Sequence, residues 1–232
     1  MVGLLVLLLL IFISALPVFA VYLWFRLARY PFSLIKFLSF LLAGAAAFFF
    51  ALVLQSLFPG TGSVSAVLAG RWNLLRQIFI RVALTEELGR FIALALLFWI
   101  LGRFEGKEDS LSYGRVSRAS AAGLVAGLGF AALEGAVYGA SDAGIALIRA
   151  FTAAPLHGAC GARVGAAAVM FRERTAHALF RFLSAAFIHG IYNFMIAMPG
   201  FPSIVAVIIA LSTLVSSILG IRNGVLPGSA EA

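Results

Sequence analysis

The sequence predicts an all-α, polytopic membrane protein: one domain over residues 1–232, folded as a bundle of about seven transmembrane helices. Of its 232 residues, 63% are hydrophobic and 11% are charged, whereas a soluble domain is about 45–50% apolar and about 25% charged. Apolar runs of about 20 residues, each able to cross the hydrocarbon core as a helix, recur along the chain. They lack the alternation over about 10 residues that marks the strands of a membrane barrel.

Turns and charged loops separate the apolar runs. The predicted spans are 4–25, 34–58, 82–101, 119–140, 145–171, 178–198 and 204–221. The first lacks a basic leader, so we interpret it as an uncleaved span and not a signal peptide. The segment 71–81 is predicted to lie at the interface before the third span, and 103–118 is predicted to be a charged loop.

The basic residues predict the orientation. Loops after the first, third and fifth spans hold most of the arginines and lysines, and the opposite loops hold mainly Arg71, Arg76 and Arg149. Because cytoplasmic loops carry the excess of basic residues, we expect the N-terminus outside and the C-terminus inside, in a prokaryotic plasma membrane. The net charge of +8 forms no aromatic-interleaved patch, so no nucleic-acid partner is expected.

Small residues recur four apart in the fourth and fifth predicted spans. The pairs are Gly123 with Gly127, Gly135 with Gly139, and Gly161 with Gly165. This spacing lets helices approach closely in a membrane. The fourth and fifth spans are therefore predicted to lie at the centre, with the first and the last at the rim.

The third span begins with a cluster of charges, Glu86, Glu87 and Arg90. Each charge near the bilayer centre costs roughly 2.5–3.5 kcal/mol on insertion scales, which favours a functional role. In a helix, Arg90 lies within reach of both acids. It can neutralise one carboxylate and leave the other for chemistry. The alternative is an ion pair that only joins helices.

Later spans add isolated polar residues. Glu134 lies in the fourth span with Phe130 one turn earlier, and it is either functional or a protonated acid bound to a neighbouring helix. His157 follows Pro155 in the fifth span, with Cys160 three residues on. A Cys–His pair is conceivable, although a buried cysteine is usually an inert hydrophobe. Arg163, further along, is expected to pair with an acid or to extend to the interface.

The sixth span places His189 and Asn193 on one helical face. The amide can fix the histidine tautomer or stabilise an oxyanion, or the two residues can simply hydrogen-bond between helices. Taken together, the four spans bring carboxylates and imidazoles, which activate water directly or around a metal ion. A transporter could use the same groups as a proton relay.

The order of these motifs resembles that of the PrsW-type intramembrane proteases, a group related to the CPBP proteins and the CAAX prenyl endopeptidases. The resemblance covers 81–198 and rests on Glu-Glu-x-x-Arg, Phe-x-x-x-Glu, a lone His and His-x-x-x-Asn. Arg90 stands where the PrsW pattern usually has lysine. Asn193 stands where it usually has aspartate, as in the CAAX branch.

The resemblance implies a membrane-embedded endopeptidase that cleaves membrane-anchored proteins, such as anti-sigma factors, in the lipid bilayer. By resemblance to the CAAX branch, Glu86 is the general base and Arg90 pairs with Glu87. His157 and His189 would position water or protonate the leaving amine, and Asn193 would stabilise the oxyanion. Phe130 and Glu134 would support the site, the acid with no defined role.

A zinc ion is the cofactor that the resemblance leaves open. Its candidate ligands are Glu86, Glu134, His157 and His189, although the contiguous His-Glu-x-x-His helix is absent. We favour glutamate-activated water without an obligatory metal. Two other classes stay open, a non-catalytic scaffold of the same fold and a proton-coupled transporter. The sequence shows no internal repeat of the kind many transporters have.

Overall fold

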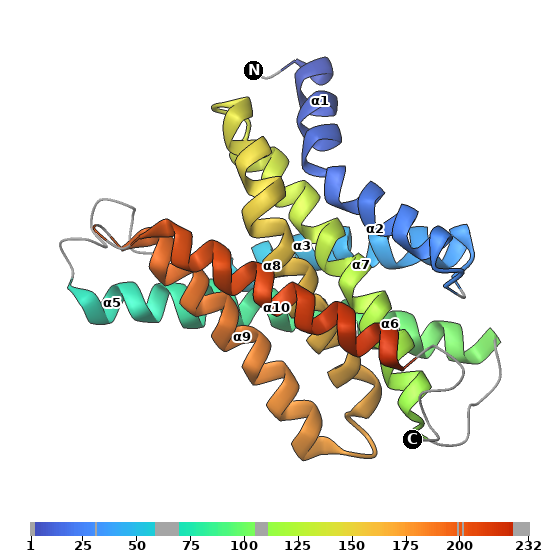
Figure 1. Ribbon diagram of the computed structural model, residues 1–232. Helices are drawn as coiled ribbons and strands as arrows, with labels where there is room; N and C mark the ends of the chain where they lie inside the picture. The colour runs from blue at the N-terminus through green and yellow to red at the C-terminus, as the bar shows by residue number, and fades with distance from the viewer. Residues whose placement is uncertain are drawn as a thin grey trace.

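The computed structural model describes residues 3–30, 32–58, 70–104, 111–198, 200 and 202–224. Within these residues all regular secondary structure is helical, so the predicted all-α bundle is confirmed (Figure 1). Residues 59–69, which include a polar loop predicted at 61–69, and residues 105–110 of the predicted loop 103–118 lie outside the described residues. The helices are α1 (Leu4–Ser14), α2 (Leu16–Leu27), α3 (Leu34–Ser56), α5 (Arg71–Arg76), η1 (Gln77–Leu84), α6 (Thr85–Phe104), α7 (Tyr113–Tyr138), α8 (Ala143–Met170), α9 (Thr175–Ala197) and α10 (Ser203–Asn223).

Five of the described helices, α3, α7, α8, α9 and α10, are long and apolar enough to cross a membrane. The pair α1 and α2 makes a sixth if it counts as one span. The remaining predicted span corresponds to α6, which has 20 residues but carries Glu86, Glu87 and Arg90 in its first two turns. The structure therefore supports five or six spans by length and composition, with α6 as the charged exception.

The predicted first span is broken. Helices α1 and α2 meet at Ala15 with a bend of 45°. Pro17, in the first turn of α2, has no N–H to continue the hydrogen-bond ladder of α1, and its ring fits only the start of a new helix. The bend therefore follows from the sequence, although the apolar composition of residues 4–25 predicts one straight helix.

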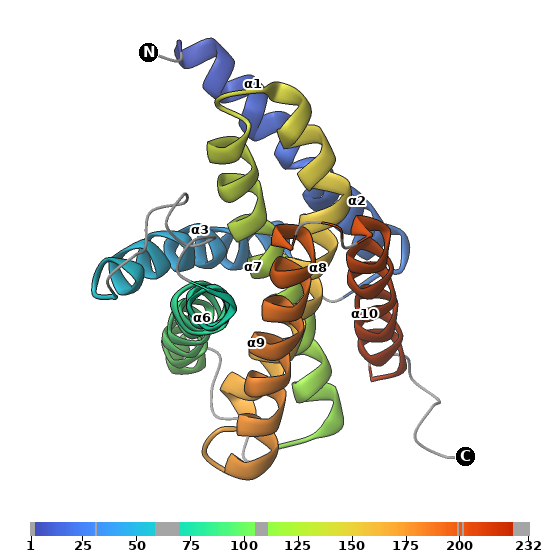
Figure 2. The same ribbon diagram turned by 90° about the vertical axis from the view of Figure 1, so that its left-hand side faces the viewer.

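The segment α5–η1–α6 forms one continuous rod. It runs across the molecule in Figure 1 and is seen end-on in Figure 2. Its middle part, η1, is a π-helix of 8 residues. A π-helical turn is rare and occurs frequently at functional sites, and this one ends immediately before Thr85, Glu86 and Glu87. The predicted interfacial segment 71–81 is thus helical and leads directly into α6.

Helices α7 and α8 lie at the centre, as predicted. Their most apolar windows are 78% and 56% buried, against 22% for α10. Glycines allow this pair to pack backbone against backbone. A Cβ atom on Gly127 would overlap the carbonyl oxygen of His157, and one on Gly123 would overlap that of Gly161. The predicted close approach of these two helices is confirmed, and it fixes His157 against α7.

Two predicted boundaries change because polar side chains cap helices. Ser112 accepts a hydrogen bond from the backbone N–H of Arg115, so α7 begins at Tyr113, inside the predicted loop 103–118. Asp142 accepts from the N–H of Gly144 at 2.8 Å and begins α8 at Ala143. Such caps satisfy N–H groups that have no partner inside the helix.

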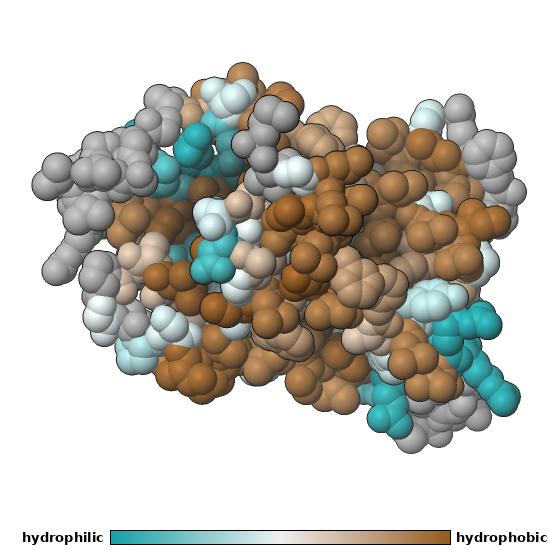
Figure 3. Space-filling model, turned by 90° about the horizontal axis from the view of Figure 1, so that it is seen from above, coloured by the Kyte–Doolittle hydropathy of each residue, from teal (hydrophilic) through white to brown (hydrophobic). Residues whose placement is uncertain are grey.

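The outer surface is largely apolar. Large hydrophobic side chains are exposed along every long helix, among them Leu5, Ile35 and Phe180. In the view of Figure 3, hydrophobic residues cover most of the face and polar residues are confined to patches. Exposed apolar patches of this extent are typical of membrane-facing surfaces. They agree with the integral-membrane assignment.

Candidate active site

The charged residues at the start of α6 are buried and joined to each other. Glu87 and Arg90 are both fully buried, and Nη1 of Arg90 donates to both carboxylate oxygens of Glu87 at 2.6 Å. Glu86 lies further away, with 3.5 Å between its Oε2 atom and Nη2 of Arg90. Arg90 therefore neutralises mainly Glu87. This arrangement leaves Glu86 the less strongly paired of the two adjacent acids.

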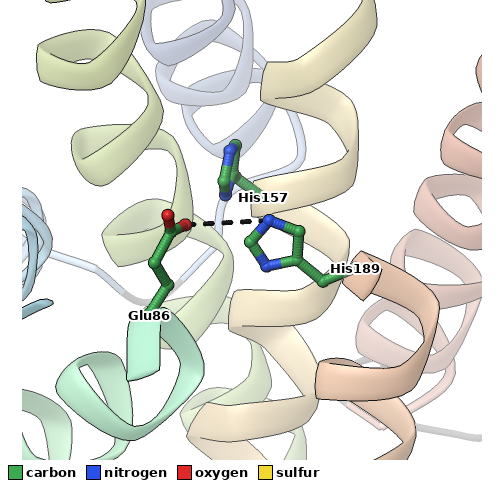
Figure 4. A group of neighbouring side chains, drawn as sticks. All are labelled: Glu86, His157 and His189. Carbon is green, nitrogen blue, oxygen red and sulfur yellow. Dashed lines mark ion pairs between the residues drawn. The ribbon is translucent and has the colours of Figure 1, made fainter. Parts of the chain in front are cut away.

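The contacts of His189 on α9 define its tautomer. Its Nδ1 atom lies 2.8 Å from Oε1 of Glu87. Because an ionised carboxylate can only accept hydrogen bonds, Nδ1 carries the proton and donates it to Glu87. In the neutral ring, Nε2 then holds the lone pair. This atom faces Oε2 of Glu86 at 3.7 Å (Figure 4).

His157 on α8 uses both ring nitrogens. Its Nδ1 atom lies 2.8 Å from Nη2 of Arg90, and a guanidinium can only donate. Nδ1 is therefore the acceptor, and Nε2 carries the proton. Nε2 donates to Oε2 of Glu134 at 2.8 Å. The ring of His157 packs edge-on against that of His189, with 4.9 Å between centroids.

Glu134 on α7 is paired. Besides His157 it binds Nη2 of Arg149 at 2.5 Å, and the guanidinium of Arg149 lies over the ring of Tyr138, 4.2 Å from its centroid. The alternative of a protonated acid bound to a neighbouring helix is right about the neighbouring helix, α8, but both partners are N–H donors, which suit an ionised carboxylate. A continuous chain of polar contacts thus runs from α6 to α8 and α7. Its members in order are Glu87, Arg90, His157, Glu134 and Arg149.

Phe130 closes one side of this chain. It is 1% exposed and lies one turn before Glu134. The guanidinium carbon of Arg90 lies 4.5 Å from the Phe130 centroid, and the ring of His157 lies 5.2 Å away. A cation over an aromatic face is attracted by the ring quadrupole. The Phe130 ring therefore stabilises the buried Arg90 guanidinium by a cation–π contact and shields it from solvent.

Glu86 keeps one oxygen free of hydrogen bonds. Its Oε1 atom accepts from Nε2 of Gln55 at 3.4 Å. Its Oε2 atom is buried and has no hydrogen-bond partner among the described residues. Two acceptors therefore face each other, Oε2 of Glu86 and Nε2 of His189. Such a pair suits a water molecule, which can donate to both, or a metal ion.

The remaining residues singled out in the sequence make no contact with Glu86 among the interactions of the described residues. Asn193 lies one turn beyond His189 on α9 and is half-buried. Its side-chain amide makes no hydrogen bond within the described part of the chain. Cys160 directs its thiol to the carbonyl oxygen of Ala185 at 3.5 Å and not to His157. Arg163 binds Ser217 at 2.9 Å instead of an acid.

Sequence reasoning missed Gln55 and Arg81. Gln55 lies near the end of α3 and contacts Glu86, while Nε of Arg81 donates to the carbonyl oxygens of Gln55 and Phe58 at 3.3 and 3.2 Å. The Gln55 carbonyl lies in the last turn of α3 and the Phe58 carbonyl just beyond it, where carbonyls lack the regular i+4 donors of a helix. An amide side chain near the end of an otherwise apolar run was the available signal for Gln55.

The polar atoms of Glu86, His157 and His189 form a possible metal-binding group. One ligand atom from each lies within 4.8 Å of the others, and all three residues are buried. Oε2 of Glu86, which lacks a hydrogen bond, and the lone pair of His189 Nε2 suit a zinc ion. The other ring nitrogen of His189 donates its N–H to the Glu87 carboxylate, as metal-bound histidines usually do. His157 would join them after giving up one hydrogen bond. Glu134, also predicted as a ligand, lies outside this group.

Comparison with protein families places this site in context. The PrsW family of intramembrane metalloproteases matches residues 31–218, which is most of the chain. The chain belongs to the PrsW family. As a PrsW-family protein it is a membrane-embedded protease at the level of the family. The match includes every residue of the buried cluster and excludes α1 and α2. No curated protein and no solved structure matches the chain.

Proposed function

We propose that the protein is an endopeptidase that cleaves membrane-anchored proteins with a water molecule activated by Glu86. One observation carries the proposal. Oε2 of Glu86 is buried without a hydrogen-bond partner and faces the lone pair of His189 Nε2 at 3.7 Å. A buried, unsatisfied carboxylate oxygen is costly. A reaction that uses this atom as a proton acceptor is the explanation that best fits its surroundings.

The proposed reaction needs one water and one proton acceptor. The water donates one hydrogen to Glu86 and one to His189, and Glu86 takes the first proton as the water oxygen attacks the scissile carbonyl carbon. The carbonyl oxygen becomes an oxyanion, and we assign the amide of Asn193, one turn beyond His189 on α9, to donate to it. Glu86 then returns the proton to the leaving nitrogen. The C–N bond breaks, leaving one new carboxyl group and one new amine.

The other buried groups hold the two reacting side chains in place. The Glu87 carboxylate fixes the tautomer of His189, and Arg90 balances the charge of Glu87. His157 is engaged at both nitrogens, so we assign it to positioning His189 and not to protonating the leaving amine. Glu134 and Arg149 anchor His157 from the far side. Removing such partners misorients a catalytic histidine.

A metal ion fits the same atoms. Glu86 and His189 would hold it, with His157 as the third ligand. When bound, a zinc ion would lower the pKa of a coordinated water and polarise the scissile carbonyl. The positioning roles of Glu87, Arg90 and Glu134 are assigned from their own contacts and apply with or without a metal ion.

The scaffold and transporter alternatives account less well for Glu86. A scaffold gains stability from paired polar groups, as in the chain from Glu87 to Arg149, and has no use for a buried carboxylate oxygen without a hydrogen bond. A proton relay would need a continuous path, yet both nitrogens of His157 are fixed by Arg90 and Glu134. The protease assignment also agrees with the family.

The test compares Glu86→Gln with Glu173→Gln in proteoliposomes that hold single-span fluorogenic substrates. Glu173 is half-exposed and pairs with Arg115 far from the buried cluster. We expect Glu86→Gln to lower kcat/KM by about 10³-fold or more, since a general base typically contributes 10²–10⁴-fold. Glu173→Gln should keep wild-type activity, and both variants should unfold at the wild-type temperature. Full activity of a correctly inserted Glu86→Gln would contradict the proposal.

Metal involvement has a separate readout. Elemental analysis of the purified protein, and thermal unfolding with and without added zinc after chelation, measure binding independently of activity. A zinc-dependent rise in the unfolding temperature that is lost in His189→Ala would support the ligand set. Chelated protein that is free of zinc, unchanged in stability and fully active would exclude a metal requirement.

A further inference from the structure

A second polar cavity lies away from the buried cluster. It has a volume of about 140 Å³ and lies between the first turns of α7, the later turns of α8, the start of α9 and the last turns of α10. These segments meet in the lower half of Figure 1, at the end of the bundle where α7 begins and α10 ends. No residue of the proposed active site lines it. Its polar lining consists mainly of two arginines and four serines: Arg163, Arg181, Ser117, Ser120, Ser216 and Ser217.

The charges around this cavity are unbalanced. Arg163 and Arg181 share it, and no acidic side chain is among its described lining residues. The nearby acid Glu173 pairs with Arg115 instead. Two guanidinium groups that share a partly buried space repel each other more strongly than they would in water. An anion between them would remove that repulsion.

The arginines also have unused hydrogen-bond donors. Nη1 of Arg163 donates to the Ala159 carbonyl at 3.1 Å and to Ser217 at 2.9 Å. Within the described residues, its other N–H groups have no protein acceptor, and Arg181 has no hydrogen bond or ion pair from its side chain. Arginine carries five N–H donors in a fork that matches carboxylate and phosphate oxygens.

The serines add donors that can be redirected. Ser117 donates to the Ile221 carbonyl at 2.7 Å, Ser120 to that of Val116 at 3.0 Å, and Ser217 to that of Thr213 at 3.0 Å. A hydroxyl rotates to suit its partner. Because the latter two bonds satisfy carbonyls that already accept helical bonds, these hydroxyls can turn toward a ligand at little cost.

We propose that this cavity binds the phosphate group of an anionic ligand, either a phospholipid headgroup or a free phosphate ion. The size agrees, because one buried water needs roughly 10–15 Å³ of such space and the cavity holds several times that. The chemistry agrees as well, since basic pockets between transmembrane helices bind anionic headgroups. By the orientation that the basic loops predict, the cavity opens at the cytoplasmic leaflet.

The test uses the full-length protein in neutral detergent and follows thermal unfolding. The probes are phosphatidylglycerol, phosphatidylcholine at the same molar ratio, and sodium phosphate against sodium chloride at the same ionic strength. A ligand that binds only the folded state raises the unfolding temperature. We expect phosphatidylglycerol to raise it by several degrees beyond phosphatidylcholine. Arg181→Gln should abolish more than half of that gain, and Arg172→Gln, an exposed neighbour outside the cavity, should retain it.

The outcomes separate the two sources. A gain from sodium phosphate alone, absent with chloride and lost in Arg181→Gln, assigns the site to the free ion, and a gain from phosphatidylglycerol only assigns it to a headgroup. Arg163→Gln is a second variant, but Arg181→Gln decides, because the Arg181 side chain has no partner among the described residues whose loss would unfold the protein. An equal gain in wild type and Arg181→Gln, or no gain from either phosphate probe, overturns the proposal.

Discussion

The two polar regions of this protein differ in how their charges are balanced. Around α6, each buried charged side chain of the described cluster has an oppositely charged neighbour, and Oε2 of Glu86, 3.5 Å from Arg90, is the carboxylate oxygen that lacks a hydrogen bond. Around the start of α9, two arginines share a cavity with no acid among its described lining residues. The first region is almost complete by itself, and the atom it leaves over is the one suited to bind water. The second region leaves two arginines without an acid among the described lining residues, and this imbalance is the basis of the proposed anion site.

The same substitution in each region gives the largest expected contrast. Arg90→Gln leaves Glu87 buried without its cation, which typically costs about 3–5 kcal/mol of unfolding free energy. Arg181→Gln removes a side chain that has no partner in the part of the chain that the structure describes, and it should change the free energy of unfolding by less than about 0.5 kcal/mol. Denaturant or thermal unfolding in detergent measures both.

Arg90→Lys sharpens this result. A lysine keeps the charge but cannot donate to Glu87 and His157 at the same time with the planar fork of arginine. It should recover part of the stability that Arg90→Gln loses. If Arg90→Gln and Arg181→Gln turned out equally mild, the first region would not depend on its internal balance.

The next largest effect is expected from adding a methyl group at a glycine near each polar region. Gly127→Ala places a Cβ atom against the His157 carbonyl, and overpacking of this kind costs about 1–3 kcal/mol. Because the clash would shift His157, peptidase activity should fall at least tenfold. The matched change is Gly220→Ala beside the second cavity, where nothing lies within 4 Å of the added Cβ. It should be neutral or slightly stabilising, because alanine is the better helix former.

The smallest expected effect tests the weakest polar contact of the active site. Gln55→Ala removes the 3.4 Å hydrogen bond to Glu86. A hydrogen bond contributes about 0.5–1.5 kcal/mol, which corresponds to a loss of about threefold to tenfold in kcat/KM. Ser217→Ala removes a 2.9 Å contact from the second cavity and should leave peptidase activity at the wild-type level. Equal kcat/KM values for Gln55→Ala and wild type would remove Gln55 from the site.

The features that the sequence predicts correctly are local. Helical spacing puts Arg90 within reach of both acids, and the observed pairing with Glu87 is the one that the family resemblance implies. The close α7–α8 packing follows from glycines four apart. The 45° bend at Ala15 is also local, but it was not predicted: residues 4–25 were expected to form one span, although Pro17 marks the break. Helix ends at Tyr113 and Ala143 were displaced by single capping side chains, which apolar run lengths do not register.

The features that could not be predicted join different helices. Helical spacing does not show that His157 bridges Arg90 and Glu134, or that His189 donates to Glu87, because these contacts depend on how α6, α7, α8 and α9 are rotated against each other. Those contacts in turn decide the tautomers, and so which nitrogen faces Glu86. Gln55 was missed for the same reason, since its role depends on the end of α3 meeting the start of α6.

The backbone contact between α7 and α8 also limits how a polypeptide can enter. At Gly123 and Gly127 the backbones of the two helices are in direct contact, with no side chains between them. No side chain at this contact could change its rotamer to open a passage between α7 and α8. An incoming protein segment must therefore reach Glu86 along another route, and any gating motion falls to the less tightly joined helices around the pair.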